Sequence, residues 1–146
     1  MKRLKVAHVV HSFLPFTQNW IYNQLLFNTD VEHSIICQFR QNAEQFPFDN
    51  VYPVLYGPAI LDKMKLQLTR LFPRFSEPAF QKIIERRLPH IIHGHFSTES
   101  WRALRVAQNR GIPLVTTFYG LDINKLPRRF VWKMRYKELF KYGSMF

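Results

Sequence analysis

Short apolar runs alternate with segments of helical periodicity along this chain, and the two patterns predict strands and helices in turn. The predicted strands cover 4–10, 33–39, 51–55, 90–95 and 114–118, and the predicted helices cover 19–28, 60–72, 77–88, 98–109 and 127–142. The first strand is apolar and β-branched, which indicates a central place in the sheet, whereas Pro53 places the third strand at an edge. This alternation is typical of an α/β domain with a parallel sheet.

The stretch 90–122 contains one strand–helix–strand unit with polar residues at the exit of each strand. Ser97 or Thr98 is suited to cap its helix, and Gly111 is suited to end it, because glycine adopts a left-handed conformation without strain from a Cβ atom. Two strands joined by a helix are expected to be parallel, with a right-handed crossover. Ligands bind outside the carboxyl ends of the strands in open α/β sheets, so both exits are candidate sites.

The composition fits one packed domain. The chain has 146 residues, of which 47% are hydrophobic and 16% aromatic. No apolar run is long enough to cross a membrane. The only cysteine, Cys37, follows two isoleucines, which indicates a packed thiol and a reducing cytosol. The net charge of +11 favours attraction to polyanions such as nucleic acid, anionic lipid or sugar phosphates.

The segment 125–141 carries basic and aromatic side chains together. In one interpretation it is a helix that packs its aromatic side chains on the sheet and exposes its charges. In the other it docks on anionic lipid, where each basic residue near the surface contributes about 1 kcal/mol. The second interpretation extends the same positive patch to Lys63, Lys65, Arg70 and Arg74.

The glycine positions exclude two common nucleotide-binding motifs. None of the five glycines lies in the turn after the first strand, so the dinucleotide fingerprint is absent. A Gly-x4-Gly-Lys phosphate loop is absent as well. The chain therefore binds another kind of ligand, or binds a nucleotide with the help of another domain.

Histidines gather on the predicted strands. His93 and His95 are two residues apart and should point to the same side, and His8 and His11 should lie near them if the first and fourth strands are neighbours. No carboxylate or cysteine at ligand spacing completes a zinc site, so no metal is expected. We interpret His8 and His93 as core histidines with hydrogen-bond partners, and His95, at the strand exit, as the candidate that faces a ligand.

Three segments of the chain resemble family-4 glycosyltransferases. HGHFS at 93–97 and TTFYGLDI at 116–123 are similar to paired family segments often written H-A-H-F-G and T-F-H-G-x-D. HVVHSFLPFTQNWIYNQL at 8–25 resembles the family's first strand and S-E-T-F-I helix start. The resemblance is strongest to the bacterial type that builds extracellular or capsular polysaccharide.

The resemblance implies a Rossmann-like parallel sheet with helices on both faces, as the N-terminal half of a GT-B fold. Residues 1–146 would be the acceptor-side domain, truncated before its last strands, with the C-terminal donor domain absent. The family transfers a sugar from a nucleotide sugar with retention, and needs no metal or other cofactor. Its partners would be the donor, a saccharide or lipid-linked acceptor, and its own C-terminal domain. The expected location is the cytoplasm, at the inner face of an anionic membrane, with no nucleic acid bound.

The same resemblance implies the site residues. His95 and Asp122 would be catalytic, and the fragment alone would be inactive. Asp122 would either position a hydroxyl or cap the loop backbone, because aspartate commonly bonds local backbone in turns. Substrate binding is expected from Phe16, Thr17, Gln18, Asn19, Phe96, Ser97, Tyr119 and Gly120. Tyr119 replaces a family histidine, so it can give a hydrogen bond but cannot carry a positive charge. Ser97 replaces a glycine, which narrows the approach to the backbone.

Two other functions remain as alternatives. Charge and interleaved aromatic residues fit a basic nucleic-acid-binding α/β module, but no RNA-binding signature is present. The strand and helix order also fits a flavodoxin-like signalling domain. That alternative lacks the acidic cluster that a phosphoacceptor site needs after the first strand.

Overall fold

A computed structural model of the chain describes residues 3–55 and 77–146, and the helix expected over 60–72 lies outside these ranges. The strands are β1 (Leu4–Phe13), β2 (Val31–Arg40), β3 (Val51–Pro53), β4 (Ile91–His95) and β5 (Leu114–Thr117). The helices are η1 (Phe16–Gln18), α1 (Asn19–Phe27), α3 (Glu77–Arg87), α4 (Ser97–Arg110), α5 (Gly120–Asn124), η2 (Leu126–Arg128) and α6 (Phe130–Tyr142). Most elements predicted from the sequence within the described ranges are present, with boundaries shifted by a few residues.

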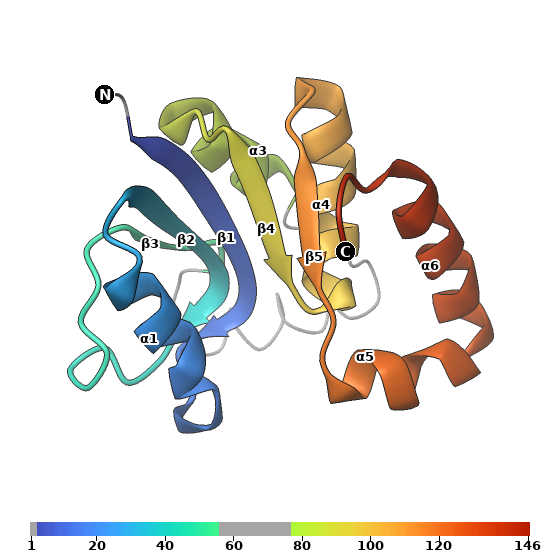
Figure 1. The fold of residues 1–146 in the computed structure, drawn as a ribbon, viewed down its shortest axis with the longest axis horizontal. Helices are drawn as coiled ribbons and strands as arrows, with labels where there is room; N and C mark the ends of the chain where they lie inside the picture. Colours follow the sequence, from blue (N-terminus) through green and yellow to red (C-terminus); the bar gives the residue numbers. More distant parts are fainter. Residues whose placement is uncertain (1–2, 56–76) are drawn as a thin grey trace.

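The strands form one five-stranded parallel sheet in the order β3-β2-β1-β4-β5 (Figure 1). The central place of β1 and the edge place of β3 confirm the sequence predictions. His8 on β1 pairs with Ile35 on β2 and with His93 on β4. Because every strand runs in the same direction, the exits of β1, β4 and β5 meet at one edge of the sheet.

Helices cover both faces of the sheet. On one face α1 packs Ile21 and Leu25 against residues such as Val10 and Ile35. On the other face α3 and α4 pack against a second cluster that includes Ile92 and Leu104. Figure 1 shows α1 on the opposite side of the sheet from α3 and α4. The Rossmann-like α/β class expected from the sequence is therefore confirmed.

Two glycines have identifiable structural reasons. Gly111 ends α4 with a left-handed φ of 63°, as predicted. Gly94 lets β4 approach α4 closely, because a Cβ atom there would lie 2.7 Å from Cα of Ser100. The family's H-A-H-F-G pattern has alanine at this position. The close strand–helix contact explains why glycine replaces it here.

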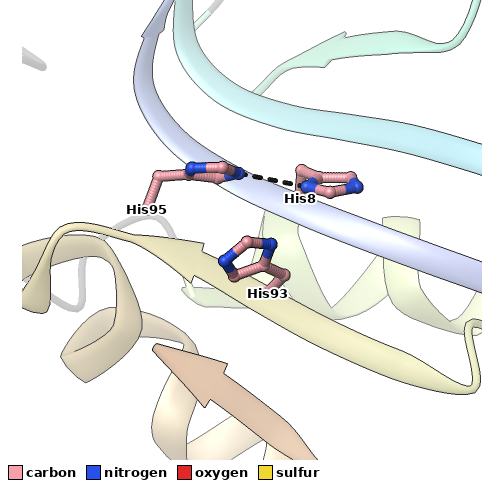
Figure 2. Close-up of side chains that lie close together, drawn as sticks. All are labelled: His8, His93 and His95. Carbon is pink, nitrogen blue, oxygen red and sulfur yellow. Dashed lines mark hydrogen bonds between the residues drawn. The ribbon is translucent and has the colours of Figure 1, made fainter. Parts of the chain in front are cut away.

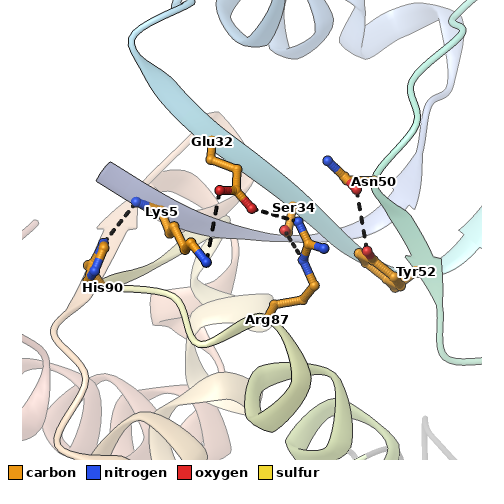
Figure 3. A network of polar contacts seen from close by, with 7 residues as sticks. All are labelled: Lys5, Glu32, Ser34, Asn50, Tyr52, Arg87 and His90. Carbon is orange, nitrogen blue, oxygen red and sulfur yellow. Dashed lines mark hydrogen bonds and ion pairs between the residues drawn. The ribbon is translucent and has the colours of Figure 1, made fainter. Parts of the chain in front are cut away.

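A polar network holds the amino-terminal edge of the sheet together (Figure 3). Arg87 at the end of α3 donates to Glu32 Oε1 at 2.8 Å and to Ser34 Oγ at 3.0 Å, and both acceptors belong to β2. Lys5 Nζ lies 4.0 Å from Glu32, and the Lys5 backbone N–H donates to Nδ1 of His90 at 2.9 Å. These contacts fix α3 and the start of β4 at the edge opposite the strand exits.

Two residues with side chains suited to helix caps, Thr17 and Ser97, do not cap a helix. Thr17 lies inside η1, because the Gln18 N–H donates to the Pro15 carbonyl, and α1 has no side-chain cap at Gln18. Ser97 is the first residue of α4 and not its cap. The cap position belongs to Phe96, which has a φ of 75° and makes no capping bond with its side chain.

The end of the chain differs in part from expectation. α5 was not predicted. Pro127 lies within η2 and does not begin the last helix, because Arg129 is extended between η2 and α6. Beyond α6, Met145 forms an isolated parallel bridge with Val115 of β5.

Candidate functional site

The loops that follow β4 and β5 meet through Tyr119 and His95. The Tyr119 hydroxyl lies 3.0 Å from Nδ1 of His95, and the Tyr119 backbone N–H donates to Asp122 at 3.0 Å. The structure therefore brings together His95, Tyr119 and Asp122, which the sequence placed at this edge.

An aromatic wall stands over this point, formed by Trp20 of α1, Phe96 and Tyr119. The Tyr119 ring centre lies 4.7 Å from that of Trp20 and 4.4 Å from that of Phe96. All three side chains are partly exposed. The sequence did not identify Trp20 as a binding residue. Its place directly after the predicted binding segment was the one available signal.

Asp122 clasps the two loops together. Its Oδ1 accepts from the Ser97 hydroxyl at 2.6 Å and from the Ser97 N–H at 3.2 Å, while Oδ2 accepts from the Tyr119 N–H. The Tyr136 hydroxyl donates to the Asp122 carbonyl at 2.7 Å. The side chain is 1% exposed. This geometry makes Asp122 a residue that positions Tyr119 and Ser97.

Four histidines line the face of the sheet under α1. Figure 2 shows His8 from β1 beside His93 and His95 from β4, with a hydrogen bond between His8 and His95. His33 from β2 completes the group through a 3.0 Å contact with His8. The four rings and Gln24 and Asn28 at the α1 side line a pocket of about 470 Å³.

His33 replaces His11 as the fourth histidine. We expected His11 near His8, but side chains alternate along a strand, so residues three apart face opposite sides. His11 instead lies 3.7 Å from Glu99 on the α4 face. The sequence did not identify His33 as a partner of His8, because their contact depends on the register between β1 and β2.

Burial favours the neutral form of three of these rings, His8, His93 and His95, because it lowers their pKa values. It lowers the pKa of His95 to about 3, with a further contribution from His93. Burial and the surrounding histidines lower the pKa of His8 well below its ordinary value, and burial lowers the pKa of His93. Burial, followed by the charge of Asp122, raises the pKa of Tyr119 to about 12. The site therefore offers neutral hydrogen-bonding groups and no fixed charge at Tyr119.

His8 and His93 have the hydrogen-bond partners expected of core histidines, since His93 Nε2 lies 2.8 Å from the Thr117 hydroxyl. His95 is only 1% exposed, and its two nitrogens contact His8 and Tyr119. It can therefore reach a ligand through Tyr119.

Three imidazoles are also a donor set that zinc accepts, and ring nitrogens of His8, His93 and His95 lie within 4.8 Å of one another. However, Nδ1 of His8 and Nε2 of His95 are 3.1 Å apart and share a hydrogen bond. Neutral imidazoles with complementary tautomers satisfy this contact. We therefore describe the group as a hydrogen-bonded cluster.

The other expected binding residues lie around the aromatic wall. Phe16 is exposed, and its ring faces Phe46 at 5.9 Å, while Thr17 and Asn19 are exposed and lead the chain into Trp20. Gln18 is partly buried in the same turn.

Gly120 begins α5 and is exposed. A Cβ atom there would meet nothing closer than 3.9 Å. Space around Gly120 therefore does not explain the glycine.

Comparison with known proteins shows the family. The profile of Glycosyltransferase Family 4 matches residues 26–144, a range that includes both strand-exit loops and begins after β1. No curated protein sequence matches the chain.

Solved structures share the fold at low identity. A UDP-N-acetylglucosamine 2-epimerase superposes with a TM-score of 0.58 at 13% identity, over 99% of this chain and 42% of the other. The UDP-GlcNAc 2-epimerase from Neisseria meningitidis, bound to UDP-GlcNAc, gives 0.61 at 15% identity, over 96% and 39%. The chain thus spans about two-fifths of these structures. At such identities the likeness shows the fold alone. Because the family profile covers most of its length, the chain belongs to glycosyltransferase family 4.

Proposed function

We propose that this chain is the acceptor-side domain of a retaining glycosyltransferase. Joined to its C-terminal domain, it would transfer a sugar from a nucleotide sugar to a saccharide or lipid-linked acceptor. The acceptor would bind at the aromatic wall of Trp20, Phe96 and Tyr119.

The aromatic wall is the observation that carries this proposal. Partly exposed aromatic rings can pack against the apolar face of a sugar while a phenol or an imidazole hydrogen-bonds its hydroxyls. The wall stands at the strand exits, where ligands bind in open α/β sheets. Of the proposed catalytic pair, His95 acts through Tyr119, and Asp122 acts by holding both loops in place.

The donor is assigned to the other domain for an electrostatic reason. Charge develops on the departing nucleotide diphosphate, and cations or a helix N-terminus must stabilise it. Among the described residues of the three strand-exit segments, 14–20, 96–98 and 118–122, there is no lysine or arginine. At the N-termini of α4 and α5, the N–H groups of Ser97 and Tyr119 already donate to the Asp122 carboxylate. Residues 1–146 alone are therefore expected neither to bind a nucleotide sugar tightly nor to turn it over.

A transfer assay tests the proposal. The chain extended by its encoded C-terminal domain should transfer labelled sugar from a nucleotide-sugar panel to a lipid extract of the source cells. Trp20→Ala should reduce transfer at least tenfold, because it removes one side of the wall. Leu26→Ala is the matched control, since Leu26 is an exposed apolar residue of the same helix that is not part of the aromatic wall. Equal losses in the two variants, or turnover by residues 1–146 alone, would contradict the proposal.

We further propose that α6 docks on anionic lipid. The expectation that its aromatic side chains pack on the sheet is met only in part, because Phe130 is 78% and Phe140 55% exposed. An open apolar groove of about 720 Å³ runs between α5, α6 and the chain end, and Lys133 and Lys137 lie along it. Apolar side chains flanked by lysines suit the boundary between lipid headgroups and acyl chains. No helix among residues 3–55 and 77–146 is long and apolar enough to cross a bilayer.

Liposome flotation tests the lipid partner. The protein should float with vesicles of phosphatidylglycerol and phosphatidylcholine, and much less with phosphatidylcholine alone. Lys133→Glu with Lys137→Glu should abolish the difference, whereas the matched exposed pair Lys82→Glu and Arg86→Glu on α3 should not. Equal recovery with both kinds of vesicle at low salt would end this proposal.

A further inference from the structure

A chain of hydrogen bonds joins three buried imidazoles to the phenol of the site. Nε2 of His33 lies 2.9 Å from the Asn28 carbonyl oxygen, and Nδ1 of His33 lies 3.0 Å from Nε2 of His8. Nδ1 of His8 lies 3.1 Å from Nε2 of His95. The other nitrogen of His95, Nδ1, lies 3.0 Å from the Tyr119 hydroxyl. We call these five groups the imidazole chain.

The Asn28 carbonyl sets the direction of the whole chain, because a carbonyl oxygen can only accept. Nε2 of His33 must therefore carry a proton, and in a neutral ring this leaves Nδ1 as an acceptor. His8 must then donate from Nε2 and accept at Nδ1, so His95 also donates from Nε2 and accepts at Nδ1. The last acceptor in this order receives the proton of the Tyr119 hydroxyl.

A protonated ring would reverse this order. Both nitrogens of an imidazolium are donors, so every bond between the charged ring and Tyr119 would turn around. The Tyr119 proton would then be free to point at a ligand. Burial opposes this state, because it lowers the pKa values of His8 and His95. The neutral chain, with all three protons on Nε2, is the order that the surroundings favour.

The direction of the Tyr119 hydrogen bond follows from the neutral order. A phenol has one proton and two acceptor positions on its oxygen, and here the proton is given to His95. The Tyr119 oxygen therefore keeps acceptor positions, and because Tyr119 is only partly buried, these can face a ligand.

We infer that the imidazole chain fixes Tyr119 as a hydrogen-bond acceptor toward its ligand, so that the site selects a hydroxyl group that donates. His8 and His33 act as positioning residues through His95, although neither lies at the strand exit. The assignment of this hydroxyl to a saccharide rests on the proposed function. The direction of the hydrogen bonds along the imidazole chain does not.

Histidine NMR on the protein tests this order directly. With 15N-labelled histidine, His8, His33 and His95 should all show a proton on Nε2 and none on Nδ1 at neutral pH. Scalar couplings should cross the hydrogen bonds from His95 to His8 and from His8 to His33. These signals do not depend on glycosyl transfer, so their failure and the failure of the proposed function can be told apart.

Two variants add a directional test. Tyr119→Phe should shift only the Nδ1 resonance of His95, toward that of a nitrogen without a hydrogen bond, and leave all tautomers unchanged. Tyr22→Phe is the matched control on the same face, because its hydroxyl donates to the Pro47 carbonyl outside the chain. A proton on Nδ1 of His8 or His95 in the wild type would overturn the inference. Loss of the couplings on adding equimolar zinc chloride would also overturn it and would assign the rings to a metal.

Discussion

Mild acid should destabilise this protein, because it folds with histidines buried as neutral rings. Burial lowers the pKa of His95 from 6.5 to about 3 in the folded protein. In the unfolded chain the same imidazole titrates near its ordinary pKa, so below that pH the unfolded state binds a proton that the folded state does not. The free energy of unfolding is therefore highest above about pH 6.5, where neither state binds this proton. It falls progressively as the pH decreases toward the folded pKa.

The size of the effect follows from this pKa shift. At about pH 5, which is about 1.5 units below the ordinary pKa, His95 alone should cost about 2 kcal/mol at about 1.4 kcal/mol per unit. His8 and His93, whose pKa values are also lowered, contribute with the same sign. Domains of this size are commonly stable by about 5–15 kcal/mol, so the loss is large.

The buried carboxyl of Glu99 should not obscure this pH window. Burial acts to raise its pKa, but the charge of Arg102 and the contact with His11 outweigh burial and hold the pKa below 4.5. The stability that Glu99 contributes is therefore present above about pH 4.5 and lost only in stronger acid.

Urea denaturation between about pH 7.5 and about pH 5 measures the effect as a fall in the midpoint concentration at constant slope. His95→Gln should flatten the pH dependence, because glutamine can hydrogen-bond without titrating. His90→Asn is the matched control, since His90 is exposed and only accepts a hydrogen bond from Lys5. A wild-type midpoint that stays constant or rises on acidification would refute the reasoning.

Three further predictions follow from the packing of the site. Gly94→Ala should destabilise the protein by about 1–3 kcal/mol or more, because the added Cβ would clash with Ser100. Adding Ser100→Ala should restore the stability only in part, because the clash includes the Ser100 Cα. Full recovery of the stability in thermal denaturation would contradict this. Asp122→Asn should lower the free energy of unfolding by about 1–3 kcal/mol and speed hydrogen exchange at the Tyr119 amide. The reason is that an amide side chain cannot accept hydrogen bonds with both of its polar atoms, as the carboxylate does. An unchanged exchange rate would show that the Asp122 hydrogen bonds are dispensable. Burial raises the pKa of Cys37 to about 12, so the thiol should react with Ellman's reagent only when the protein is unfolded in urea. Fast labelling of the folded protein would show instead that Cys37 is accessible.

The sequence was sufficient for the elements whose signals are local. Apolar, β-branched runs predicted all five strands of the described sheet. Pro53 placed β3 at the edge, because proline has no N–H to donate to a neighbouring strand. Gly111 was identified as a helix end from its intrinsic freedom alone. The spacing of His93 and His95 predicted that both point to one face, because alternation along a strand is a local property.

The caps and the last helices were harder to predict, because distant groups compete for the same atoms. Ser97 has the side chain of a helix cap, but its hydroxyl is bound by Asp122, which lies 25 positions along the chain. Propensity cannot include a partner that only the fold brings near. Asp122 itself accepts backbone N–H groups from both loops, which is a role that aspartate commonly takes in turns.

By itself, the sequence determined the strand and helix order, the parallel α/β class and the edge of the sheet that carries the candidate site. These follow from local periodicity, chain direction and the rule that parallel strands exit on one side. Only the tertiary structure decided that His33 and not His11 joins His8, and that Trp20 stands over Tyr119. Strand register and helix rotation set those contacts, and both are fixed by packing across the whole sheet.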